Sequence, residues 1–291
     1  MLTASAQAKL NLILEVLGQH ENGYHEVRSI AQTIALHDTL SFEEADGIQV
    51  TCTEPSLVRD NLVEHAARLI RNRYAPQRGV HIHLQKRIPW GAGLGGGSSD
   101  AAATLLALNT LWHLNLEPED ITTMARSLGS DVSLFLQGGT VMLEGTGDTA
   151  ISAPPLPLTH LVLLVPGTTQ LQRKTALLYA RLQQTHFTKG QFVDAALFSL
   201  RKGTAIPRDL LFNVFEKVAF DFFPGLEQTR VDFRETVGER VHLTGSGPCL
   251  FALGGSEIQA QETATRLHAL GYNAYVTHTT DAPDNLSGFP C

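Results

Sequence analysis

The segment with the strongest chemical signature in the sequence is a glycine-rich run, Gly91–Ser99. Five of its first seven residues are glycines, two serines follow, and a stretch of helical periodicity begins at once. Glycine lets a backbone approach a ligand closely, and a helix N-terminus adds free N–H donors and the positive end of its dipole. The run therefore predicts a phosphate site, whose serine hydroxyls could bind phosphate or metal-bound water. A purely structural loop is the alternative, but nothing structural demands so many glycines there.

Two better-known phosphate motifs fit this run poorly. A P-loop requires Gly-Lys-Ser/Thr, and Gly97 stands where the lysine should be. The dinucleotide pattern G-x-G-x-x-G is formally present over Gly91–Gly96, but residues 88–90 separate it from the preceding strand. The acidic residue about twenty positions further on, Glu117, has no second strand to carry it. Neither motif explains the run.

The elements around the run are indicated by hydrophobic periodicity. Residues 8–17 alternate, which predicts a strand with one buried face and with Lys9 and Asn11 together on the other. Residues 21–23 (Glu-Asn-Gly) predict a turn into a second extended stretch over 24–36. The remaining elements predicted for this half are short strands over 38–53, helices over 60–74, 98–113 and 118–128, and a strand over 80–84.

The proline-rich segment 154–157 is the best candidate for a linker. It divides the chain into a first part over 1–153 and a second part over 158–281, and the turn-rich residues 282–291 predict a loose tail. In the second half we expect strands over 160–165, 240–244, 249–253 and 272–277, and helices over 173–185, 208–221 and 256–270.

Composition excludes several classes of function. The net charge is -7, and no basic stripe with interleaved aromatics is visible, which argues against a nucleic-acid partner. The three cysteines lie far apart and show neither metal-ligand spacing nor a disulfide framework. The first apolar segment contains Lys9, Asn11 and Glu15, unlike a signal peptide, and no apolar stretch reaches membrane-spanning length. We expect no membrane partner and a cytoplasmic location.

Five motifs, in this order, resemble those of the GHMP kinases, the family of galactokinase, homoserine kinase and mevalonate kinase. They are AKLNL (8–12), GYHEVRS (23–29), IPWGAGLGGGSSDAA (88–102), LGSDVSLF (128–135) and LTGSGPCLFAL (243–253). Within that family the chain is similar to the kinases of non-mevalonate isoprenoid biosynthesis. The resemblance implies the GHMP kinase fold, with two α+β domains, 1–153 and 158–281, and the active site in the cleft between them. The activity that it implies is ATP-dependent transfer, with Mg²⁺, to the 2-hydroxyl of a small acceptor that carries cytidine diphosphate. It also implies a monomer or homodimer.

The resemblance also implies a role for individual residues. Lys9 and Asp131 would be the catalytic pair. Asn11, Tyr24, His25, Tyr179 and Ser246 would contact the acceptor, with Tyr24 stacking on cytosine, His25 hydrogen-bonding it and Tyr179 as the candidate second aromatic. Ser246 could instead only shape a turn. Asn61, Leu62 and Lys86 would lie near adenine. The ATP phosphate loop would comprise Pro89, Trp90, Gly91, Ala92, Gly93, Leu94, Gly95, Gly96, Gly97, Ser98 and Ser99.

Without the motifs, these residue types would have ordinary interpretations. A lone Lys9 would be a solvated lysine, Asp131 a helix cap or loop residue, and His25 a packed structural histidine. Departures from the family pattern include Asn22 in place of aspartate before Gly-Tyr-His, and a longer, more polar segment before Tyr179. Two alternative functions stay open at this point: a kinase for mevalonate- or homoserine-like acceptors, and a non-catalytic nucleotide-binding protein on the same fold.

Overall fold

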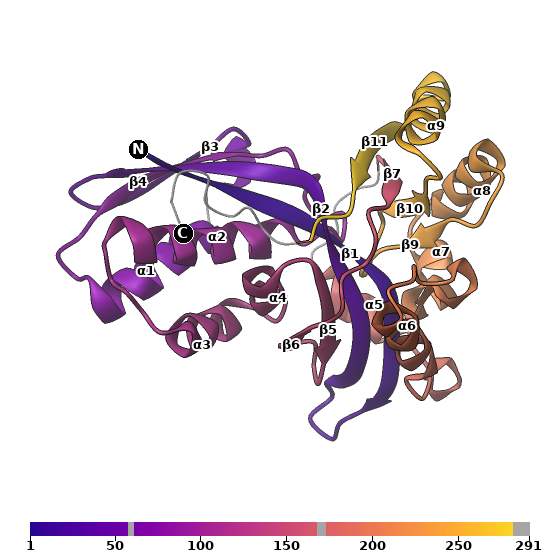
Figure 1. Ribbon diagram of the computed structural model, residues 1–291, viewed down its shortest axis with the longest axis horizontal. Coiled ribbons are helices and arrows are strands. Elements are labelled where there is room, and N and C mark those ends of the chain that lie inside the picture. Colours follow the sequence, from indigo (N-terminus) through magenta and orange to yellow (C-terminus); the bar gives the residue numbers. More distant parts are fainter. Residues whose placement is uncertain (58–60, 168–172, 282–291) are drawn as a thin grey trace.

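The computed structural model describes residues 1–57, 61–167 and 173–281. Two sheets, each flanked by helices, form the described chain, as Figure 1 shows. The larger sheet has seven strands, the smaller has four, and the predicted α+β class is confirmed. The predicted tail at 282–291 lies outside the described residues.

The two longest strands organise the larger sheet. β1 (Leu2–Gln19) and β2 (His25–Glu44) form an antiparallel hairpin whose ends meet at the predicted turn. In that turn the N–H of Gly23 donates to the His20 carbonyl oxygen at 2.9 Å. Register shifts interrupt the pairing after Gln7, Asn11 and Val16, so the ladder is irregular near Lys9 and Asn11. Such irregularities re-aim side chains, and they occur next to active sites more often than elsewhere.

The other elements of the first half complete this sheet and cover one of its faces. Helix α2 (Gly96–Leu111) packs against both α1 (Leu62–Tyr74) and β1. The strands are β3 (Ile48–Cys52), β4 (Val80–Gln85), β5 (Thr140–Glu144) and β6 (Thr149–Ser152). The helices are α1 (Leu62–Tyr74), α2 (Gly96–Leu111), α3 (Pro118–Leu128) and α4 (Val132–Gln137).

The second half is built around the smaller sheet, whose strand order is β11-β7-β10-β9. These strands are β7 (His160–Val165), β9 (His242–Leu243), β10 (Leu250–Leu253) and β11 (Asn273–His278). The helices are α5 (Lys174–Tyr179), α6 (Gln191–Arg201), α7 (Ala219–Phe222), α8 (Leu226–Val237) and α9 (Glu257–Ala269).

The two halves share strand pairing and core. Strand β8 (Phe212–Asn213) belongs to the second half of the chain, yet it pairs in parallel with β1 of the larger sheet. One apolar cluster combines β1 residues such as Leu10 with β10 residues such as Phe251. The division into domains 1–153 and 158–281 stays a prediction. The two halves of the chain pack closely against each other on either side of the predicted linker.

Three predictions about elements need correction. Residues 208–221 do not form one helix, because β8 interrupts two short 3₁₀ turns there before α7 begins. The helix predicted over 173–185 is shortened to α5 and a 3₁₀ turn at Gln184–His186. Strand β1 does not have a single buried face, since Lys9 and Asn11 are as buried as their apolar neighbours. Both halves of the chain cover the face that alternation marked as polar, since Lys9 packs beside Gly95 of the glycine run and both Lys9 and Asn11 lie against the 244–245 turn.

Candidate active site

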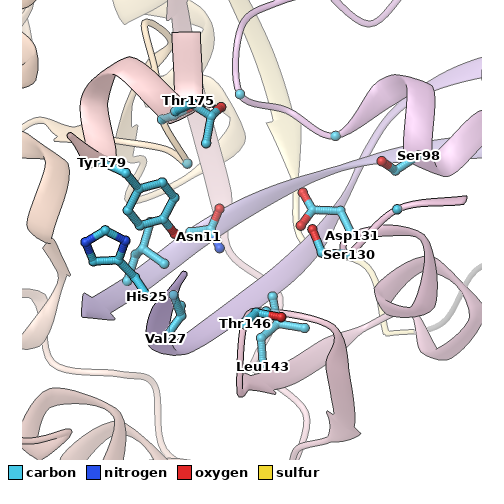
Figure 2. Close-up of a pocket in the computed structure, with 18 of the residues that line it drawn as sticks. Asn11, His25, Val27, Ser98, Ser130, Asp131, Leu143, Thr146, Thr175 and Tyr179 are labelled. Carbon is cyan, nitrogen blue, oxygen red and sulfur yellow. Dashed lines mark hydrogen bonds between the residues drawn. The ribbon is translucent and has the colours of Figure 1, made fainter. Parts of the chain in front are cut away.

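A single elongated cleft of about 1030 Å³ contains most of the residues selected from the sequence. Its walls come from β1, the β1–β2 turn, the glycine run, the start of α4, α5 and the 245–246 turn. In Figure 2, Tyr179 and His25 lie at one end of the cleft, Asp131 and Ser98 at the other, and Asn11 between them. Lining residues from the predicted set are Lys9, Asn11, Tyr24, His25, Leu62, Gly91, Gly93, Gly95, Gly96, Gly97, Ser98, Asp131, Tyr179 and Ser246.

The glycine run ends in helix α2, which begins two residues earlier than periodicity predicted. Gly95 adopts a left-handed conformation, with φ of 74°, and precedes the first turn at Gly96. A Cβ on Gly95 would lie 2.7 Å from the Phe135 ring and 3.0 Å from Cγ of Lys9, so only glycine fits. The free N–H groups of the first turn open into the cleft, which gives the run the geometry of an anion site.

The two glycine motifs of the chain pack against each other. A Cβ on Gly93 would lie 2.6 Å from the carbonyl oxygen of Thr244, and one on Gly245 would lie 2.9 Å from that of Gly93. The amide of Asn213 fixes the second motif by donating at 2.9 Å to the carbonyl oxygens of both Leu243 and Gly245. Motifs about 150 residues apart in sequence therefore form one backbone surface.

The predicted catalytic pair is brought together at the centre of the cleft. Nζ of Lys9 lies 3.7 Å from Oδ2 of Asp131 and donates a 2.5 Å hydrogen bond to Oδ1 of Asn11. Asn11 donates in turn to Ser29 at 2.9 Å, which holds its amide in one orientation. Asp131 precedes helix α4 but does not cap it with its side chain. The Asp131 side chain is 38% exposed, whereas the Lys9 side chain is 5% exposed. The carboxylate is therefore accessible from the cleft, while its cationic partner is buried.

At the other end of the cleft His25 and Tyr179 stack directly. Their ring centroids are 4.7 Å apart with an interplanar angle of 22°, and Phe215 meets Tyr179 edge-on at 4.9 Å. Burial, and then the nearby Asp131 charge, raise the pKa of Tyr179 to about 12. Burial, and then the neighbouring His20, lower the pKa of His25. Both side chains are therefore neutral near pH 7. Tyr24 is 64% exposed at the rim.

Lys86, predicted to lie near adenine, is engaged in a buried ion cluster behind the glycine run. Its ammonium donates to Asp100 at 2.8 Å and to Asp38, and all three side chains are at most 6% exposed. Burial lowers the pKa of Lys86, but the two carboxylates outweigh this and raise it overall. Burial, together with Asp38, raises the pKa of Asp100 to about 7 against the opposing effect of Lys86. A Cβ on Gly96 would lie 3.2 Å from the ammonium, so the cluster supports the loop from behind.

Several other predicted residues take supporting positions. The Asn61 side chain caps helix α1, accepting from Val63 N at 2.9 Å and donating to the Leu57 carbonyl oxygen at 2.7 Å. The Ser246 hydroxyl lines the cleft and lies 2.9 Å from that of Thr175. The loop members that do not line the cleft are Pro89, Trp90, Ala92, Leu94 and Ser99, and Trp90 is 45% exposed.

Comparison with known proteins identifies relatives that are similar in sequence over nearly the whole chain. Residues 61–139 match the model of the GHMP kinase N-terminal domain. The 4-diphosphocytidyl-2-C-methyl-D-erythritol kinase of Dehalococcoides mccartyi is 40% identical over 96% of this chain and 98% of its own length. The enzyme of the same name from Caldicellulosiruptor bescii is 34% identical over 98% of this chain and 99% of its own length. The chain belongs to the 4-diphosphocytidyl-2-C-methyl-D-erythritol kinase family.

Solved structures agree with this family assignment. A crystal structure of 4-(cytidine 5'-diphospho)-2C-methyl-D-erythritol kinase superimposes with a TM-score of 0.81 at 35% identity, covering 95% of this chain and 98% of the other. A homoserine kinase from Cytophaga hutchinsonii aligns with a TM-score of 0.69 at 18% identity, over 98% and 96% of the two chains, which shows the shared fold. The chain has the GHMP kinase fold and is an ATP-dependent small-molecule kinase.

Several cleft-lining residues of this family member were not identified from the sequence, and Thr146 and Lys174 are two of them. Thr146 lines the cleft from the turn between β5 and β6, where Gly145 accepts a 2.7 Å hydrogen bond from Val27 N. Lys174, the first residue of α5, donates at 2.8 Å to the carbonyl oxygen of Gly91. Thr146 lies between Gly145 and Gly147, and this short glycine turn is the signal that could have found it, whereas no local pattern marks Lys174.

The described residues also limit two classes of partner and cofactor. None of the helices in residues 1–57, 61–167 and 173–281 has the length and apolar character to cross a membrane. The same part of the chain contains no group of three or more His, Cys, Asp or Glu side chains arranged for a metal ion.

Proposed function

We propose that this protein phosphorylates the 2-hydroxyl of 4-diphosphocytidyl-2-C-methyl-D-erythritol with ATP, giving the 2-phosphate and ADP in non-mevalonate isoprenoid biosynthesis. The observation that carries the proposal is the order of sites along one cleft. A backbone anion site, a lysine–aspartate pair and a stacked aromatic pair follow one another there. A donor phosphate, an acceptor hydroxyl and a nucleobase need these surfaces in that order.

Asp131 accepts or orients the proton of the attacking hydroxyl in this mechanism. An ordinary aspartate is a weak base at neutral pH, but a loose phosphoryl-transfer transition state asks for little basicity until late. Lys9 places its ammonium 3.7 Å from that carboxylate. It also stabilises the charge on the transferring group. Asn11 holds the ammonium in place and presents its own amide to the acceptor.

The donor nucleotide lies along the glycine run. Loop N–H groups and the α2 N-terminus bind its phosphates, while Leu62, which lines the cleft, packs near adenine. The ammonium of Lys86 is already bound by two carboxylates. The backbone N–H of Lys86 is also engaged, because it donates to the Thr53 hydroxyl. The contact of Lys86 with the nucleotide is therefore proposed through its main-chain carbonyl oxygen. Asn61 acts by fixing the start of α1.

Mg²⁺ fits the oxygen donors present. Hard cations prefer carboxylate, hydroxyl and phosphate oxygens, and Mg²⁺ in kinases is held by one or two protein groups plus the substrate phosphates. Ser98 and Asp131 are the cleft residues that offer such oxygens beside the phosphate site. Bound there, the ion would neutralise phosphate charge during transfer.

The cytosine end of the acceptor lies at the His25–Tyr179 pair. The His25 ring covers one face of Tyr179, so a cytosine that stacks on that face takes the place of the imidazole. The displaced His25, neutral near pH 7, then offers both a donor and an acceptor to the base edge. Tyr24 at the exposed rim closes the stack from the other side.

One assay tests the proposed function: release of ADP with 4-diphosphocytidyl-2-C-methyl-D-erythritol, mevalonate and homoserine as parallel acceptors. Turnover with the first alone is expected. Turnover with only mevalonate or homoserine would contradict the acceptor assignment. Nucleotide binding without turnover of any acceptor would favour a binding protein.

A further inference from the structure

Lys174 is the one charged group of the cleft that the proposed mechanism does not use. Among the described residues that line the cleft, the lysines are Lys9 and Lys174, and the only carboxylate is that of Asp131. Asp131 pairs with Lys9. No described carboxylate forms an ion pair with Lys174, so its charge lacks a counter-ion. A partly buried ammonium without a counter-ion costs free energy unless an anion joins it.

The position of Lys174 is set by two carbonyl oxygens from opposite halves of the chain. Its Nζ donates to Gly91, at the start of the phosphate run, and to Gly247, in the second glycine motif. An ammonium has three N–H donors, so two bonds to neutral carbonyls leave one donor and the whole charge available. The side chain is therefore held at the junction of the two motifs, where they form the anion-binding surface.

We propose that Lys174 is a second cationic ligand of this cleft, and that its free N–H binds a phosphate oxygen beside Lys9. The inference rests on the proposed function for the identity of the ligands. The oxygen could come from the terminal phosphates of ATP or from the diphosphate of the acceptor. Both would present an anionic phosphate oxygen to the Lys174 ammonium.

The electrostatic surroundings of Lys174 fit such a role. Burial, and then the Lys9 charge, lower the pKa of Lys174 to about 8. Cys249, the other ionisable neighbour, has a thiol pKa raised by burial to about 12 and stays neutral. A bound phosphate would raise the pKa of Lys174 again. Affinity for that ligand is thus constant below about pH 8 and declines as the pH rises further.

Steady-state kinetics of Lys174→Gln, with Lys217→Gln as a matched control, test the proposal. Glutamine keeps N–H donors for the carbonyl oxygens but removes the charge, and Lys217 is an exposed lysine of the same half of the chain. Loss of one charge-assisted hydrogen bond corresponds to a roughly 10- to 100-fold rise in KM. A rise for ATP, with weaker ADP binding by calorimetry, identifies the donor as the ligand. A rise for the acceptor, with weaker CDP binding, identifies the acceptor diphosphate.

The pH profile separates a ligand-binding role from a purely structural one. The wild-type affinity should fall from about pH 8 upward, and the Lys174→Gln profile should lack that fall. Unchanged KM values for both substrates, or a lower melting temperature with the wild-type pH profile retained, would overturn the proposal. The wild type could fail to turn over the acceptor while Lys174→Gln still binds ADP more weakly than the wild type does. That result would contradict the proposed function but would support the role of Lys174 in phosphate binding.

Discussion

Nζ of Lys9 lies 3.7 Å from Oδ2 of Asp131, although the two residues come from the first strand and from the start of helix α4. The lysine is almost fully buried, while the carboxylate reaches into the cleft. This pair lies between the backbone anion site and the aromatic pair, and its asymmetry suits a fixed cation and an accessible base.

Asp131→Asn should lower kcat by about 100- to 10,000-fold, because proton transfer by a positioned group contributes about that much. Its affinity for ADP, measured by calorimetry, should stay close to the wild-type value. Ser130→Ala is the matched control, since Ser130 also lines the cleft beside Asp131. A kcat within a few-fold of wild type would exclude Asp131 from the chemistry.

Lys9→Met should lower kcat by at least about 100-fold, comparable to removal of one preorganised transition-state contact. The melting temperature should hold or rise, because methionine replaces a buried cation with an apolar chain of similar length. Lys217→Met, at an exposed position, provides the comparison. Full activity in Lys9→Met would mean that Asp131 acts without its cationic neighbour.

Tyr179→Ala should raise the KM of the cytidine-bearing acceptor by about 5- to 100-fold, since stacking on an aromatic side chain contributes about 1–3 kcal/mol per base. The KM of ATP should change little. Tyr179→Phe keeps the ring and its packing on Phe215, and the neutral phenol makes that variant close to wild type. Equal KM values in the alanine and phenylalanine variants would argue against stacking.

Gly93→Ala should damage both stability and activity. The added Cβ would lie 2.6 Å from the backbone oxygen of Thr244, and the φ of 90° at this residue strains any side chain. Gly97→Ala is the matched comparison, because its Cβ would meet only the Leu62 side chain at 3.8 Å. Alanine inside the first turn of α2 should preserve or raise the melting temperature. Identical unfolding curves for the two variants would mean that the glycine motifs separate easily.

Asp100→Asn should change how stability depends on pH. The pKa of Asp100 is raised to about 7, above the ordinary 3.8, so the native state binds a proton more tightly than the unfolded state. Stability contributed by that proton is present at acidic pH and is lost as pH rises through about 7. The loss is at most about 4 kcal/mol, at about 1.4 kcal/mol per unit of pKa.

Denaturant unfolding of wild type and Asp100→Asn at pH 5 and pH 8 measures this effect. Asparagine mimics the protonated acid, so the variant should gain stability relative to wild type between the two values. Asp148→Asn, in an exposed turn between β5 and β6, serves as the control. A constant difference between Asp100→Asn and wild type would show that Asp100 does not titrate in this range.

Sequence predicted most of the site because the relevant segments carry local signals. Glycine clusters indicate close backbone approach, and the alternation around Lys9 and Asn11 indicates a strand. The position of Lys174 in the site could not be predicted, because its partners, Gly91 and Gly247, lie in distant segments and no residue near it indicates those contacts. Residues 208–221, bounded by Pro207 and Pro224, are predicted to be helical. The structure differs because Phe212 and Asn213 pair with β1 as strand β8, a long-range contact that no local pattern indicates.

The pairing of β8 with β1 has a consequence for how the chain acquires its structure during synthesis. The strand that carries Lys9 is synthesised long before β8 (Phe212–Asn213), which pairs with it at Ile13 and Leu14. Contacts of such long sequence separation close slowly and late. We therefore expect the acceptor side of the cleft to mature as one of the last steps of folding. A chain truncated before residue 212 should leave the apolar flank of β1 exposed to aggregation.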